Sequence, residues 1–125
     1  MKIDTHREDE RGNVITLLEA VEFEGLVIPA GFESDGASVP RIFWRLIFPP
    51  TDTRAVRAAV VHDYIYRNQP EGWTRPEADT VFRRILIEDG MERWRSWAAW
   101  IGIRIGAGWA WEKAKFEKAI SGMWK

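Results

Sequence analysis

The residues best suited to chemistry in this chain are the adjacent His62 and Asp63, which lie in the middle of an apolar stretch. Residues 58–67 around them are mostly alanine, valine, isoleucine and tyrosine, a composition that favours a buried helix. A buried charge is costly unless it is paired or binds a metal. The imidazole and the carboxylate therefore each need a partner from elsewhere in the chain.

Two interpretations of this pair are open. Neighbouring positions on a helix point about 100° apart, so His62 and Asp63 cannot share one contact. In the first interpretation, Asp63 pairs with Arg67 one turn later on a solvated face and His62 is a hydrogen-bonded core histidine. In the second, both side chains belong to a functional site.

Asp79 is the expected partner of His62. It lies near the start of the next predicted helix, and the short connection at residues 69–73 makes the two helices antiparallel neighbours. We therefore expect His62 and Asp79 to lie within hydrogen-bond distance, directly or through one water. A carboxylate that accepts one imidazole N–H fixes the tautomer and leaves the other nitrogen as a base.

Asp35 and Asp63 remain for another role. Asp35 lies in a turn beside Gly36, and carboxylates together with loop carbonyls are the oxygen ligands that suit Ca²⁺ at about 2.3–2.6 Å. A base next to such a cation can activate water and polarise a carbonyl. Because the number of ligands is low, any calcium here should be weakly held.

The elements that position these residues begin with short strands. Residues 1–12 predict a frayed or edge segment, and strands are predicted at 14–18, 21–23 and 26–28, forming hairpins with a polar outer face. Residues 31–40 predict a loop, because an Asp-Gly pair favours a tight turn.

Two helices follow as the centre of the fold. The first is predicted at about 53–68 and the second at about 75–88, where Thr74 is the expected N-cap and Glu77 completes a capping box. The expected buried stripe of the second helix is Ala78, Val81, Phe82, Ile85 and Leu86.

The chain after residue 91 predicts a long Trp-rich C-terminal helix, with six of the eight tryptophans after position 93. Glycines at 102, 106 and 108 predict either close helix packing or a kink. Trp94, Trp97, Ile101 and Ile105 share one face, which we expect to pack on the helix pair. Since the remaining rings cannot all join that face, we expect an exposed patch that binds a protein partner or a second copy in a homo-oligomer.

Composition limits the class of protein. The 125 residues, 46% of them hydrophobic, predict one α+β domain over 1–125, with a β-rich part at 1–33 and a helical part at 34–125. A net charge of −1 and a pI near 6.1 predict no nucleic-acid binding. There are no cysteines, so thiolate metal sites and disulfides are excluded. Neither a signal peptide nor a transmembrane segment is expected.

Four motifs together resemble a known family. They lie at residues 27–32, 34–40, 59–67 and 77–79, in this order. The set looks like a family of small proteins of unassigned function that is common in tailed phages and prophages, and the resemblance covers most of the chain. It implies a phage-encoded protein, located in the host cytoplasm or in the virion, with no established activity.

A narrower region, about residues 34–85, is similar to the secreted phospholipase A2 superfamily, particularly its short bacterial and fungal members. The pattern consists of residues 34–36, 62–68 and 79–82. The chain departs from those enzymes in having no cysteines, where they are disulfide-bonded.

This second resemblance implies roles for particular residues. It implies that His62 is the water-activating base, that Asp79 orients His62 and that Tyr66 supports the network. The implied calcium ligands are Asp35, Asp63 and the Gly36 carbonyl. The leading functional hypothesis is therefore a calcium-dependent acyl hydrolase acting on a lipid or another ester. The alternative is a non-enzymatic virion or assembly component in which the same residues form a structural hydrogen-bond network.

Overall fold

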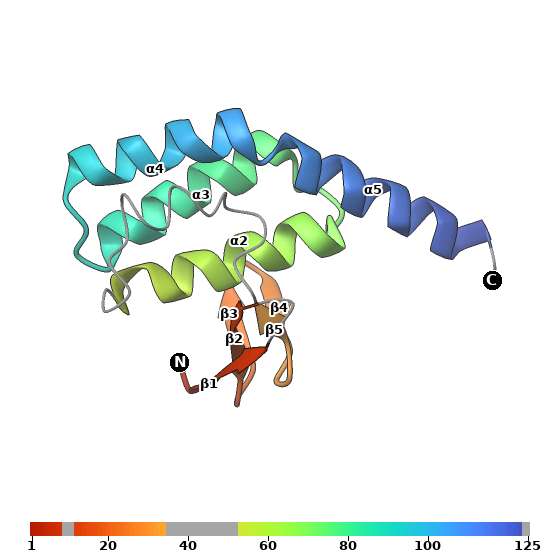
Figure 1. Cartoon of the computed structure of the whole chain (residues 1–125), viewed down its shortest axis with the longest axis horizontal. Coiled ribbons are helices and arrows are strands. Elements are labelled where there is room, and N and C mark those ends of the chain that lie inside the picture. The colour runs from red at the N-terminus through yellow and green to blue at the C-terminus, as the bar shows by residue number, and fades with distance from the viewer. Residues whose placement is uncertain (9–11, 35–52, 124–125) are drawn as a thin grey trace.

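The structure is a computed structural model that describes residues 1–8, 12–34 and 53–123. A small β-rich part lies beneath a body of helices, as Figure 1 shows. This confirms the α+β class, with an antiparallel sheet first and an antiparallel helix pair behind it. The predicted calcium ligands Asp35 and Gly36 lie outside the described residues.

The β-rich part contains two small antiparallel sheets. The three-stranded sheet has the order β1-β2-β5, and β3 pairs with β4 in a hairpin. The strands are β1 (Ile3–Glu8), β2 (Gly12–Leu17), β3 (Val21–Phe23), β4 (Leu26–Ile28) and β5 (Glu33–Ser34). The short strand β5 was not predicted. This strand matters for the site because it places Ser34 beside the helix at residues 56–68.

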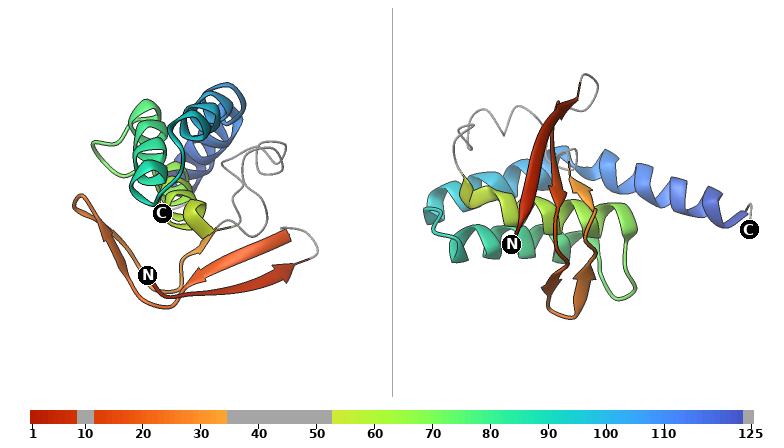
Figure 2. Two further views of the ribbon diagram at one scale, coloured as in Figure 1. Left: turned by 90° about the vertical axis from the view of Figure 1, so that its left-hand side faces the viewer. Right: turned by 90° about the horizontal axis from the view of Figure 1, so that it is seen from below.

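The helices follow in chain order. They are the 3₁₀ turn η1 (Thr53–Ala55), α2 (Val56–Asn68), α3 (Arg75–Glu88), α4 (Arg93–Gly106) and α5 (Gly108–Met123). Figure 1 shows α2, α3 and α4 as successive layers above the sheets, with α5 extending away from them. The end-on view in Figure 2 shows the sheets on one side of α2 and both α3 and α4 on its other side.

The helix pair that carries the site forms where the sequence predicted it. Helix α2 has an almost entirely buried middle and ends at Gln69, whose φ of 43° is left-handed. Gly72, with a φ of 86°, then turns the chain back, a backbone conformation that glycine adopts without steric cost. Thr74 caps α3 by accepting a hydrogen bond from the Glu77 N–H at 3.4 Å, as expected.

The C-terminal segment corrects one prediction. Instead of one long helix, the chain forms α4 and α5, which meet at Ala107. The break falls within the glycine-containing stretch, so the expected kink is present.

The face of α4 that packs on the helix pair was predicted wrongly. Trp94 and Ile105 are 69% and 78% exposed, and Trp97 and Ile101 are also exposed. The buried residues of α4 are Ser96, Ala99, Gly102 and Ile103. These are mostly small side chains, and a small-residue face permits a closer approach of two helices than a row of indoles. Because α4 lies close to the helix pair, its residue Arg104 reaches the buried Asp79 of α3. No helix of the described segments is long and apolar enough to cross a membrane.

Candidate functional site

A histidine and an aspartate meet in the interior between α2 and α3. His62 Nε2 lies 2.7 Å from Asp79 Oδ1, and both side chains are fully buried. This confirms the hydrogen bond predicted from the short connection between the helices. Tyr66 and Phe82 flank the imidazole, with ring centroids 4.2 Å and 5.0 Å from that of His62. The imidazole is therefore held by packing as well as by Asp79.

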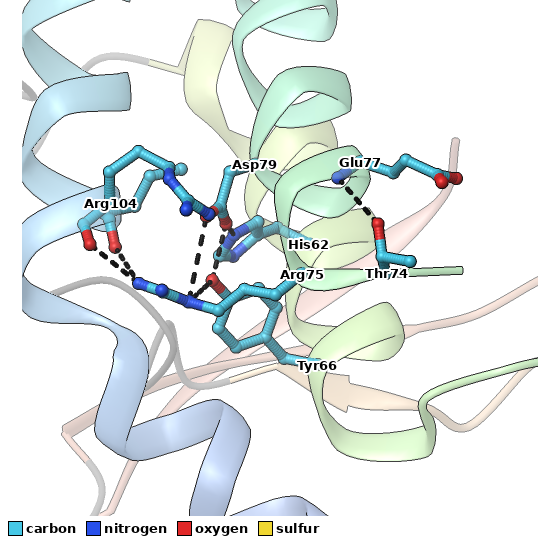
Figure 3. A network of polar contacts seen from close by, with 8 residues as sticks. His62, Tyr66, Thr74, Arg75, Glu77, Asp79 and Arg104 are labelled. Atoms are coloured by element: carbon cyan, nitrogen blue, oxygen red, sulfur yellow. Dashed lines mark hydrogen bonds and ion pairs between the residues drawn. The ribbon is translucent and has the colours of Figure 1, made fainter.

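Tyr66 belongs to the same network, as Figure 3 shows. Its phenol O–H donates to Asp79 Oδ1 at 2.6 Å, so one carboxylate oxygen serves both the imidazole and the phenol. Burial and the neighbouring Asp79 raise the pKa of Tyr66 well above its ordinary value. Tyr66 therefore remains a neutral hydrogen-bond donor throughout the ordinary pH range.

Two arginines complete the network, and neither was predicted. Arg104 of α4 donates from Nη1 to Asp79 Oδ2 at 2.8 Å. Arg75 lies with Nε 3.2 Å from the Tyr66 hydroxyl and 4.0 Å from Asp79 Oδ2. Its Nη2 also donates to the carbonyls of Ile103 and Arg104, at 3.2 Å and 2.8 Å, so it joins α3 to the end of α4 (Figure 3). Two signals were available: Arg104 interrupts an apolar run, and Arg75 lies one turn before Asp79.

These donors determine the charge of Asp79. Burial alone would raise the pKa of this carboxyl group. The hydrogen bonds from His62, Tyr66 and Arg104 outweigh burial, and the pKa of Asp79 lies below its ordinary value. Asp79 is therefore an ionised acceptor at neutral pH, and Nε2 of His62 must carry the proton of their hydrogen bond. In the neutral imidazole, Nδ1 is then the nitrogen that can accept a proton.

Asp63 faces a different direction from His62, as the helix geometry requires. It is buried, and the Ser34 hydroxyl donates to its Oδ2 at 2.5 Å. The interpretation that Asp63 lies on a solvated face is therefore wrong. Arg67, the partner proposed in that interpretation, donates from Nη1 to the Glu33 carbonyl at 2.7 Å. Ser34 was missed as a partner because β5 was not predicted.

The structure describes one of the three predicted calcium ligands, Asp63. Within residues 1–8, 12–34 and 53–123, no group of three or more histidine and acidic side chains gathers as a metal site would require. Ser34, the residue before the predicted ligand Asp35, is in contact with the Asp63 carboxylate. The calcium site therefore stays a prediction, because Asp35 and Gly36 lie outside the described residues and only Asp63 can be placed.

Comparison with protein families places the chain. Residues 16–103 match the model of a family described as "Protein of unknown function (DUF1353)". The chain belongs to this family. The DUF1353 match covers His62, Tyr66 and Asp79 and ends immediately before Arg104. It agrees with the predicted membership of a family of unassigned function, whereas the predicted phage origin is untested by it.

A curated relative and the solved structures add to this comparison. The chain is 29% identical over 86 residues to "Uncharacterized protein y4jT" of Sinorhizobium fredii (strain NBRC 101917 / NGR234). The match covers 68% of this chain but 25% of the relative, so the chain spans about a quarter of that protein's length. No solved structure matches the chain.

Proposed function

We propose that this DUF1353 protein is an acyl hydrolase of the phospholipase A2 type, in which His62 is the general base. The observation that carries the proposal is the 2.7 Å contact between His62 Nε2 and the ionised Asp79. A carboxylate in this position orients the imidazole and stabilises the imidazolium that forms during the reaction. Tyr66, on the same carboxylate oxygen, restricts the rotation of Asp79.

The proton transfers follow from this arrangement. His62 Nδ1 accepts a proton from a water molecule while the water oxygen bonds to the ester carbonyl carbon. The tetrahedral intermediate then collapses, the carbon–oxygen bond to the leaving alcohol breaks, and the imidazolium returns its proton to the alkoxide. The products are a carboxylic acid and an alcohol. Because His62 is fully buried, the reaction requires a local opening that admits water and ester.

Calcium is part of this proposal. Asp63, Asp35 and the Gly36 carbonyl would hold the ion, and a hard cation bound there would polarise the ester carbonyl. The Asp63 carboxylate offers oxygen ligands of the kind that calcium prefers, and Ser34, the residue immediately before Asp35, donates to its Oδ2. Proton transfer remains the task of His62.

The resemblance of the four motifs to those of a tailed-phage family supports a further part of the proposal, a phage or prophage origin. The protein would then act in the host cytoplasm or within the virion. Recovery of the protein from purified particles of an induced prophage, detected by mass spectrometry, supports the virion location. Its confinement to the cell lysate supports the cytoplasmic one.

The test compares ester hydrolysis by three forms of the protein. The substrates are phospholipid vesicles and a soluble short-chain ester, each assayed with calcium and with a chelator. In His62→Gln the side-chain amide can still donate to Asp79 but cannot act as a base, so hydrolysis should fall by at least about 100-fold while the melting temperature changes little. His6→Gln, at the other histidine of the chain, is the matched control and should retain full activity.

A specific observation also favours the non-enzymatic alternative. His62 and Asp79 are both fully buried, and Asp79 is satisfied by three donors, as in a network that stabilises a fold. Under this alternative the wild-type protein shows no hydrolysis of either ester, and His62→Ala destabilises by roughly 1–3 kcal/mol because Asp79 loses a donor. That pair of results would exclude the hydrolase.

A further inference from the structure

The charges of the chain are divided between two sides of the molecule. Residues 1–8 and 12–34 contain six acidic residues and two lysines or arginines, whereas residues 93–106 of α4 contain three arginines and no acidic residue. The whole chain carries a net charge of only −1, so this division is hidden in the overall composition. Figures 1 and 2 place the sheets and α4 on opposite sides of α2. The acidic and basic sides therefore do not face each other within one molecule.

The basic side is also apolar. The outer face of α4 consists of the exposed side chains of Trp94, Trp97, Ile101 and Ile105. These positions recur at three and four residues and so form one stripe along the helix. Arg93 and Arg95 flank the stripe at its first turn, and the Arg83 guanidinium of α3 stacks over Trp97 at 3.7 Å from the ring centroid. Arg95 is paired with Glu92, the residue immediately before α4, at 3.6 Å.

The acidic side carries apolar residues of its own. On the outer face of the β3–β4 hairpin, Glu22 and Val27 are cross-strand neighbours, and both are exposed. Leu18 and Glu19, also exposed, lead directly into β3. Leu18 and Val27 are each 59% exposed. We refer to these four residues as the hairpin face.

We propose that this protein self-associates head to tail, with the outer face of α4 in one copy packed against the hairpin face of the next. Tryptophan and arginine are the residues most enriched at the energetic centres of protein interfaces. Opposite charges around an apolar centre supply the steering and specificity that such a contact needs.

The charges also decide against a symmetric dimer. Two α4 faces packed together would bring arginines against arginines, and two hairpin faces would bring carboxylates against carboxylates, both of which are unfavourable. When two copies associate through two different faces, one α4 face and one hairpin face of the dimer remain uncovered and can bind further copies. Such a contact therefore generates a ring if the rotation closes and a filament if it does not. This inference is independent of the proposed hydrolase.

Sedimentation velocity of the full chain over a range of concentrations tests the proposal. The helix variant carries Arg93→Glu and Arg95→Glu, and the hairpin variant carries Glu19→Lys and Glu22→Lys. Glu71→Lys, in the exposed α2–α3 connection, is the matched charge-reversal control. Circular dichroism establishes that each variant is folded. The salt series runs from about 10 mM to about 1 M NaCl, which shortens the Debye length from about 30 Å to about 3 Å.

The wild type and the control should form species larger than the 14.5 kDa monomer at low salt and dissociate as salt is raised. Each variant alone should sediment as a monomer, and an equimolar mixture of the two variants should associate again, because each supplies the face that the other needs. A wild-type protein that stays monomeric under all conditions would overturn the proposal. The proposal would also be overturned if the hairpin variant still associated, because the α4 faces of two copies would then pack symmetrically against each other.

Discussion

Arg104→Met gives the most informative test of the buried network. The substitution keeps much of the side-chain length but removes the cation that contacts Asp79 Oδ2 at 2.8 Å. Asp79 remains fully buried, and its carboxylate keeps His62 and Tyr66 as donors. The Arg75 guanidinium, 4.0 Å from Oδ2, is the nearest remaining positive charge described there.

The expected loss of stability follows from this geometry. Removing one partner of a fully buried ion pair costs about 3–5 kcal/mol. The Arg104 side chain is 30% exposed, so water screens part of the interaction, and a charged hydrogen bond is worth about 1.5–3 kcal/mol. We therefore expect a destabilisation of about 2–3 kcal/mol. For a domain of this size, that corresponds to a fall in melting temperature of about 8–12 °C.

Thermal and urea unfolding, followed by circular dichroism, measure this loss. Arg93→Met, at an exposed position of the same helix, is the control and should change stability by no more than about 0.5 kcal/mol. The double variant with Asp79→Asn should show a coupling energy of at least about 1 kcal/mol, because the neutral amide no longer needs the cation. Equal effects of the two arginine substitutions, or additive effects in the double variant, would refute this account of the network.

Three further substitutions test other contacts. Tyr66→Phe removes the phenol that donates to Asp79 and should lower stability in urea by about 1–2 kcal/mol, whereas Tyr64→Phe should have a smaller effect. Ser34→Ala leaves the buried Asp63 without its hydroxyl donor and should cost about 1–3 kcal/mol; a loss no greater than that of a surface serine would count against this contact. Because the pKa of Asp79 is lowered on folding, its contribution is present above the unfolded pKa of about 4 and is lost as pH falls through the folded value. The difference in melting temperature between the wild type and Asp79→Asn should therefore shrink on acidification below about pH 4, and a constant difference would contradict it.

The sequence predicted the parts of the fold that depend on local signals. The turn at Gly72 and the cap at Thr74 fix the start of α3, and this start determines which residue of α3 reaches His62. The hydrogen bond between His62 and Asp79 followed from that local geometry alone. The hairpin strands at 21–23 and 26–28 were likewise readable from β-branched residues on either side of a glycine.

The parts that were missed depend on contacts between distant segments. Periodicity showed that Trp94 and Ile105 share a face of α4, but it could not show which face the protein buries. The buried face instead carries small residues such as Ala99 and Gly102, whose advantage is close approach rather than hydrophobic area. The role of Arg104 depends on this packing, since an arginine on a helix ordinarily indicates a solvated position. The contact between Ser34 and Asp63 was not predicted, because a two-residue strand has too little sequence pattern to be recognised.

The tautomer of His62 is the measurement that tests the central claim most directly. The proposed mechanism requires the proton on Nε2, directed at Asp79 Oδ1, so that Nδ1 is the basic nitrogen. Nitrogen-15 NMR of the ring can identify the protonated nitrogen, and the two histidines of the chain are assigned by comparison with His6→Gln. The account predicts an Nε2-protonated neutral imidazole for His62 whose signals change in Asp79→Asn. A neutral His62 protonated on Nδ1, or signals that Asp79→Asn leaves unchanged, would contradict it.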